Sequence, residues 1–598
     1  MQKNLDLGVI GNGSISALID TRGRYVWACQ PRFDGDPVFC ALLDDKPFED
    51  EAAFGFFEVD LARLVRSEQR YIRNTAVLVT RLEDDRGGVV EIIDFAPRFR
   101  QFGRTYRPQA YARLVCPIAG TPRLRLRLRP ATDYGARPAG RTHGSNHIRY
   151  VGDEGTLRLT TNAPLTYILD ETYFDVEQEL VFFLGPDETF QRDVRLAVRD
   201  MMEGTILYWQ TWVRHLALPL EWQEVVIRAA ITLKLCQHEE TGAIIAAMTT
   251  SIPEAAHSGR TWDYRYCWLR DAYYVVQALN RLGAVDILEP YLAYLRNLIN
   301  EADGGHLQPV YGIGRKARLI ERQVPTLPGY RGMGPVRVGN QAHEHLQHDV
   351  YGQVVLSVAQ AFFDERLLRP MNMTDFELLE RMAERAAALH AVPDAGLWEL
   401  RTKARVHTYS SMMCWAACDR VAKVAAHLGL GEKAAAWSER ARAIHDTITA
   451  RAFNAEAGFF TGSFEGTELD ASLLQMVDIR FLPASDPRFR STLRAIESAL
   501  VRGRHVMRYV ESDDFGAPEN AFNICTFWYI EALAASGEHA RAREIFGEML
   551  SRRNHVGLLS EDIALADGEL WGNYPQTYSL VGLINSAVLL SKPWSEAR

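Results

Sequence analysis

The chain has 598 residues, of which 47% are hydrophobic, 24% charged and 10% aromatic, which is typical of a globular protein with more than one domain. Its net charge of −9 offers no basic field for phosphates and argues against nucleic acid or an anionic membrane as partner. No window reaches the about 18 uninterrupted apolar residues of a membrane-spanning helix. The start, MQKNLDLGVIGNGS, lacks the apolar core of a signal peptide, and the scattered cysteines form no CxxC pair. We therefore expect a cytoplasmic protein with buried free thiols.

The first third of the chain is predicted to form strands. The segment VIGNGSISALIDTRGRYVW predicts a hairpin that turns at DTRG. Its GNG lacks the third glycine of a dinucleotide-binding loop, and a strand pattern follows it instead of a helix. Residues 123–129, RLRLRLR, alternate strictly, so we expect the leucines to face a core and the arginines to face solvent. Short β-rich segments broken by Gly and Pro continue, which predicts an N-terminal β domain over residues 1–190.

From about residue 191, the apolar residues recur with the period of a helix. This pattern predicts a helical linker over 191–221 and a helical domain over 222–598. The helical stretches of that domain are 222–237, 268–283, 286–300, 349–366, 374–390, 409–428, 431–450, 469–476, 488–502, 521–537, 538–552 and 574–591. Twelve helices can pair into six hairpins closed as a toroid, although an open solenoid would have the same count. Long loops such as 303–340 and 554–575 are typical of functional segments.

Residues 260–283, RTWDYRYCWLRDAYYVVQALNRLG, place aromatic rings and fixed charges at the mouth of a helix. One interpretation makes Asp271 an N-cap and Arg270 a surface charge. The other makes them hydrogen-bonding groups for a polyhydroxylated ligand, with Tyr264 and Trp268 as flat surfaces for its C–H faces. Sugars need both kinds of contact.

Two glutamates stand near tryptophans in separate segments. Glu399 follows Trp398 in GLWEL, and burial beside an indole favours the protonated carboxyl that a general acid needs. Glu561 lies in GLLSEDIALADGELWG, ahead of Trp571, where a helix start or a solvated turn is the alternative. Paired carboxylates are the minimum requirement for glycoside hydrolysis.

Two further polar clusters have simpler alternatives. Arg508 lies in MRYVESDDFG, which can also be a solvated acidic loop. QAHEHLQHD contains His343, His345 and His348, but a zinc-binding HExxH helix needs its second histidine at position 347, which is Gln347. We therefore expect no metal and no organic cofactor.

The ordered motifs WDYRYCWLRDA, LQPVYGI, PGYRG, VRVGN, QHDVYG, GLWEL, SEDI and GELWGNYPQTYSLVGLINSA resemble glycoside hydrolase family 15, the family of glucoamylases, glucodextranases and bacterial trehalases. The N-terminal block IGNGSISALIDTRGRYVWACQPRFDGDPVFCALLD is also similar to bacterial members, so the resemblance covers almost the whole chain. It implies an N-terminal antiparallel β-sandwich, a helical linker and a catalytic (α/α)6 barrel.

The resemblance also implies residue roles in an inverting hydrolysis, with Glu399 as general acid and Glu561 as general base. The implied substrate-binding residues are Tyr264, Trp268, Arg270, Asp271, Trp398, Arg508 and Trp571. An inverting enzyme needs its two carboxyl groups about 6.5–9.5 Å apart to admit water between base and sugar. His343 stands where bacterial members usually have a small residue, so the leaving-group side cannot be carried over from the family.

The expected activity is release of β-glucose from the non-reducing ends of short α-glucans, of the glucoamylase type. Trehalose, isomaltose and dextran are alternative substrates within the family, some of whose bacterial trehalases are thought to need phosphate and Mg²⁺. An inverting disaccharide phosphorylase has the same architecture but uses phosphate in place of activated water, and the presence of Glu561 argues against it. A non-catalytic carbohydrate-binding protein would need neither glutamate.

Overall fold

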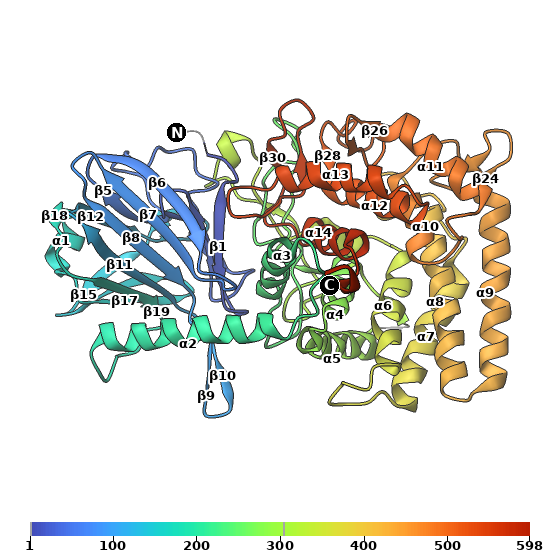
Figure 1. The fold of residues 1–598 in the computed structure, drawn as a ribbon, viewed down its shortest axis with the longest axis horizontal. Helices are drawn as coiled ribbons and strands as arrows, with labels where there is room; N and C mark the ends of the chain where they lie inside the picture. The colour runs from blue at the N-terminus through green and yellow to red at the C-terminus, as the bar shows by residue number, and fades with distance from the viewer. Residues whose placement is uncertain (1–2, 303–304, 598) are drawn as a thin grey trace.

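The computed structural model describes residues 3–302 and 305–597. Figure 1 shows a β-rich N-terminal part beside a helical C-terminal part, with α2 (Val194–Arg214) running along the lower edge of the sheets. Helix α2 falls inside the predicted linker 191–221, while the exact domain boundaries stay a prediction. In the described residues, no helix is both long and apolar enough to cross a membrane. The cysteines are free, and all except the half-buried Cys116 are buried.

The N-terminal part is an antiparallel β-sandwich, as predicted. The first sheet contains β1 (Leu7–Gly11), β2 (Ser16–Asp20), β3 (Tyr25–Gln30), β4 (Asp36–Phe39), β5 (Phe56–Leu61), β12 (Arg123–Arg129) and β18 (Phe174–Asp175). The second contains β6 (Leu64–Tyr71), β7 (Leu78–Asp84), β8 (Val89–Phe95), β11 (Tyr111–Ala119), β15 (Gly140–His143), β16 (His147–Gly152), β17 (Gly155–Thr161) and β19 (Leu180–Gly185). One apolar core includes side chains of both sheets, and the predicted turn at DTRG joins β2 to β3. A short hairpin, β9 (Phe99–Gln101) and β10 (Arg104–Tyr106), projects below α2 (Figure 1).

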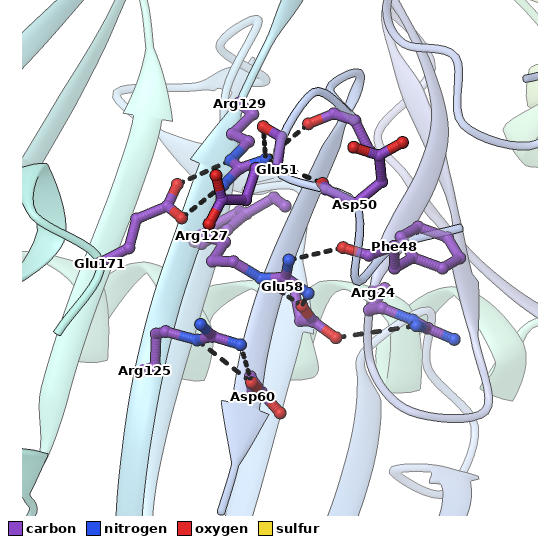
Figure 2. A network of polar contacts seen from close by, with 12 residues as sticks. Arg24, Phe48, Asp50, Glu51, Glu58, Asp60, Arg125, Arg127, Arg129 and Glu171 are labelled. Atoms are coloured by element: carbon purple, nitrogen blue, oxygen red, sulfur yellow. Dashed lines mark hydrogen bonds and ion pairs between the residues drawn. The ribbon is translucent and has the colours of Figure 1, made fainter. Parts of the chain in front are cut away.

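Strand β12 corrects the prediction made for RLRLRLR. Its leucines are buried as expected, but its arginines do not simply face solvent, and Arg127 is only 5% exposed. Arg123 is exposed as predicted, but Figure 2 shows that the other three arginines pair with carboxylates of neighbouring segments: Arg125 with Asp60, Arg127 with Glu58, and Arg129 with Glu171. Two of these acids lie directly opposite their arginines on β5, so the outer face of the sheet is a ladder of ion pairs.

The helical part is a closed (α/α)6 barrel, which settles the choice between toroid and solenoid. Contacts lead from α4 (Leu269–Arg281) to α6 (Asp349–Ala359), α8 (Thr408–His427), the short pair η5 (Ala471–Leu474) and α10 (Gln475–Asp478), α12 (Asn523–Ala535), α14 (Thr577–Leu590) and back to α4. The outer helices are α3 (Gln223–Leu235), α5 (Val285–Glu301), α7 (Met373–Leu389), α9 (Gly431–Ala452), α11 (Pro487–Leu500) and α13 (His539–Ser551). Inner helices such as α6 and α14 are buried on nearly all sides, whereas α9 buries one apolar stripe.

Candidate active site

A pocket opens at the end of the barrel where the inner helices begin. Each contributing segment precedes an inner helix: 246–271 leads into α4, 340–345 into α6, 397–401 into α8, 508–522 into α12, and 561–578 into α14. The lining mixes carboxylates, arginines and aromatic rings, which is the mixture that binds a sugar. Closure of the barrel therefore gathers segments that are far apart in the sequence.

Glu399 has a partly exposed carboxyl group, 22% accessible, on the pocket wall. The Trp268 indole Nε1–H donates to its Oε1 at 2.6 Å, and Arg270 Nη1 lies 3.6 Å from the same oxygen. Because an indole can only donate, a proton on Glu399 belongs on Oε2. The backbone of Glu399 has φ of 60°, an unfavourable region for a residue with a side chain, and such residues cluster at active sites.

Glu561 is 1% exposed and has donors on both oxygens. The Tyr264 hydroxyl donates to Oε1 at 2.7 Å, and the Asn573 backbone N–H points at Oε2 from 3.4 Å. Burial raises the pKa of Glu561, and the charge of Glu254 raises it further, while these donors and Arg508 act in the opposite direction. The donors on both oxygens favour the ionised form that a general base needs, whereas burial opposes it.

One loop supplies the donors to both glutamates. The rings of Tyr264 and Trp268 meet edge to face, with centroids 5.3 Å apart, so the two carboxyl groups are held on either side of an aromatic pair. In the same loop, Arg265 forms a fully buried ion pair with Asp263 at 2.9 Å. Arg265 also donates to the Gly35 carbonyl at 2.9 Å, which ties this loop to the β-sandwich.

Arg270 and Asp271 both line the pocket, as predicted from the sequence. Arg270 Nε donates to Oδ2 of Asp271 at 3.2 Å, and its Nη1 donates to the Leu397 carbonyl at 2.7 Å. Burial raises the pKa of Asp271 to about 6, although the Arg270 charge opposes that shift. The pair forms a buried, fixed set of donors and acceptors at the closed end of the pocket.

Arg508 also lies in the pocket, where it contacts Glu254, a residue that the sequence did not single out. Glu254 also accepts from the Trp262 indole N–H at 2.8 Å. Asp562, next to Glu561, is buried, and its Oδ2 has no hydrogen-bond partner among the described residues. Burial and the Glu561 charge raise the pKa of Asp562, and only Glu561 has donors on both oxygens, which favours a neutral Asp562 beside an ionised Glu561.

The two remaining predicted tryptophans lie in different places. Trp398 lines the pocket, but its indole N–H donates to Asp470 at 2.7 Å, so the indole that contacts Glu399 is Trp268. Trp571 is not among the lining residues. It is buried edge-on against Tyr330, with ring centroids 6.0 Å apart, and the structure does not bring it to the pocket.

The three histidines of QAHEHLQHD separate. His343 points its Nδ1 at the Asn340 carbonyl, 2.9 Å away, and neither His343 nor His348 lines the pocket, whereas His345 does. Across residues 3–302 and 305–597, no group of three or more His, Cys, Asp or Glu side chains is placed to hold a metal ion.

A closed (α/α)6 barrel behind a β-sandwich, with paired glutamates in a polar and aromatic pocket, defines a glycoside hydrolase. The sequence matches the model of glycosyl hydrolases family 15 over residues 222–588 and that of a trehalase-like N-terminal domain over residues 5–173. The chain belongs to glycosyl hydrolases family 15.

Relatives match along almost the whole chain. A trehalase of Thermoplasma volcanium is 29% identical, over 98% of this chain and 93% of the relative. A trehalase of Mycolicibacterium smegmatis is 31% identical, over 99% and 92%. Among solved structures, a bacterial glucoamylase complexed with acarbose superposes with a TM-score of 0.66 at 13% identity, over 97% of this chain and 93% of the other. At 13% identity, the similarity to the glucoamylase shows a shared fold and nothing about the substrate.

Proposed function

We propose that this protein is an exo-acting, inverting α-glucosidase whose substrate is trehalose. The observation that carries the chemistry is the pair Glu399 and Glu561, each fixed by one aromatic donor of the same loop. Support for trehalose comes from the relatives, since proteins named trehalase match over nearly the full length of both chains. The sequence alone favoured short α-glucans as the substrate, whereas the relatives favour trehalose.

In the proposed mechanism, the closed end of the pocket holds one glucosyl unit against Arg270, Asp271 and Arg508. Glu399 gives the proton on Oε2 to the glycosidic oxygen as the bond breaks. Glu561 takes a proton from a water molecule, which attacks the anomeric carbon from the opposite face of the ring. Inversion at one centre of α,α-trehalose releases one β-glucose, and the leaving sugar departs as α-glucose.

The substrate is tested by initial rates of glucose release from trehalose, maltose and isomaltose, each with and without phosphate. We expect the highest kcat/KM for trehalose. Faster hydrolysis of maltose or isomaltose would show that the preferred substrate is an α-glucan and not trehalose. Glucose 1-phosphate that forms only in the presence of phosphate would make it a phosphorylase.

A further inference from the structure

His345 is a pocket residue that the mechanism above does not use. It follows the short helix η3 (Gln341–Glu344) and precedes α6, and its side chain lines the pocket. Both ring nitrogens are buried and, among the described residues, neither has a hydrogen-bond partner. A buried polar group without a partner costs free energy unless a ligand or water supplies the hydrogen bond.

His345 lies on the side of the scissile bond where the leaving sugar is expected. The closed end of the pocket is deeply buried, with Glu561 at 1% and Arg508 at 7% exposure. Glu399 at 22% and Arg401 at 20% belong to the outer part, and both their charges act on His345. An exo-acting enzyme places the terminal sugar at the closed end, so the leaving sugar lies toward the mouth, on the side of His345.

Arg401, the arginine of the outer part, is already engaged by other partners. Arg401 pairs with Glu321 at 2.9 Å, and its backbone N–H donates to Asp514 at 2.6 Å. Burial lowers the pKa of His345, partly offset by Glu399, so the ring is neutral near pH 7. A neutral imidazole has one N–H donor and one nitrogen acceptor, the complement of neighbouring sugar hydroxyls.

We propose that His345 binds the hydroxyl groups of the leaving glucose and so helps to set the specificity for the second sugar. This inference rests on the proposed function, because it assigns to His345 the leaving half of the same substrate. It requires His345 to matter for a sugar leaving group and not for the glucosyl unit itself.

The test compares trehalose with α-glucosyl fluoride, which has the same glucosyl unit but no leaving sugar. His345→Ala and His345→Phe are expected to lower kcat/KM for trehalose about 3- to 10-fold, the value of one neutral hydrogen bond. Both variants should leave kcat/KM for the fluoride unchanged.

The matched control is His343→Ala, which removes an imidazole two residues away that does not line the pocket. This variant should have the same relative effect on kcat/KM for trehalose and for the fluoride. Equal losses on trehalose and the fluoride in the His345 variants, or no loss on either, would each overturn the proposal. If the wild-type protein hydrolyses the fluoride and maltose but not trehalose, the proposed substrate fails. The same comparison with maltose then decides the role of His345.

Discussion

At the scale of single residues, the hydrogen-bond donors around the two glutamates differ in the way that an acid and a base require. Glu399 is partly exposed and receives one donor on one oxygen, which leaves the other free to carry a proton. Glu561 receives donors on both oxygens, which favours an ionised carboxylate, although its burial raises the pKa. Two carboxyl groups placed in different environments can perform opposite proton transfers at one pH.

The assigned roles predict different behaviour of two isosteric variants. Glu399→Gln and Glu561→Gln should each lower kcat for trehalose by about 10²–10⁴-fold. Because fluoride departs without a proton, Glu399→Gln should retain much more activity on α-glucosyl fluoride, whereas Glu561→Gln should not. Steady-state rates on both substrates check this. Equal losses of fluoride hydrolysis in the two variants would remove Glu399 from the acid role, and unchanged trehalose hydrolysis in either variant would show that its glutamate is misassigned.

The environment of Glu561 predicts the acid side of the pH profile. The base must be ionised, so activity is present above its raised pKa and is lost as the pH falls through that value. Glu254→Gln removes a charge that raises this pKa, so the acid limb of kcat/KM should move to lower pH. Tyr264→Phe removes a donor that lowers it, so the limb should move to higher pH. Shifts in the same direction for both variants would show that another group sets the limb.

At the scale of elements, the helices of the barrel could be predicted from the sequence, but most contacts of the site could not. Each predicted helical stretch contains a helix of the structure, because periodic apolar residues and end signals are local. The indole that binds Glu399 comes from Trp268, 131 residues away, and adjacency in GLWEL suggested Trp398 instead. Glu254 lies in a loop without any motif. Only closure of the barrel brings such residues together.

The turn after β30 (Leu570–Trp571) shows how the loops constrain the base. Gly572 has φ of 76°, and a Cβ there would lie 2.6 Å from Cβ of Glu561. Gly572→Ala should displace Glu561 and lower kcat by about 10²-fold. The control is Gly429→Ala, with φ of 75° and open space around the added Cβ. It should have a similar backbone cost of about 1–2 kcal/mol but keep its activity. Full activity in Gly572→Ala would contradict the proposed position of the base.

At the scale of the whole molecule, the β-sandwich supports the catalytic loop. Arg265 reaches the Gly35 carbonyl and the Tyr134 hydroxyl, and the Trp27 indole N–H donates to the Met248 carbonyl at 2.8 Å. The sequence predicted both parts, because strand and helix periods differ, but it held no signal for the contact between them. The loop that fixes both glutamates is thus itself fixed by the other domain.

The buried ion pair of that loop predicts a large effect on stability. Arg265→Leu leaves Asp263 without its partner in a fully buried place, which should cost about 3–5 kcal/mol of unfolding free energy. Chemical denaturation, followed by tryptophan fluorescence, measures the change. The control Arg451→Leu breaks an exposed pair with Glu465 and should hardly move the midpoint. Equal midpoints for the two variants would show that Arg265 does not anchor the loop.

The most direct measurement of the central claim is a proton NMR time course of trehalose hydrolysis, read before the products mutarotate. Inversion by Glu399 and Glu561 predicts that α-glucose and β-glucose appear at equal initial rates, the β form from the attacked ring and the α form from the leaving sugar. Appearance of α-glucose alone would mean retention of configuration and would contradict the roles proposed for the two glutamates.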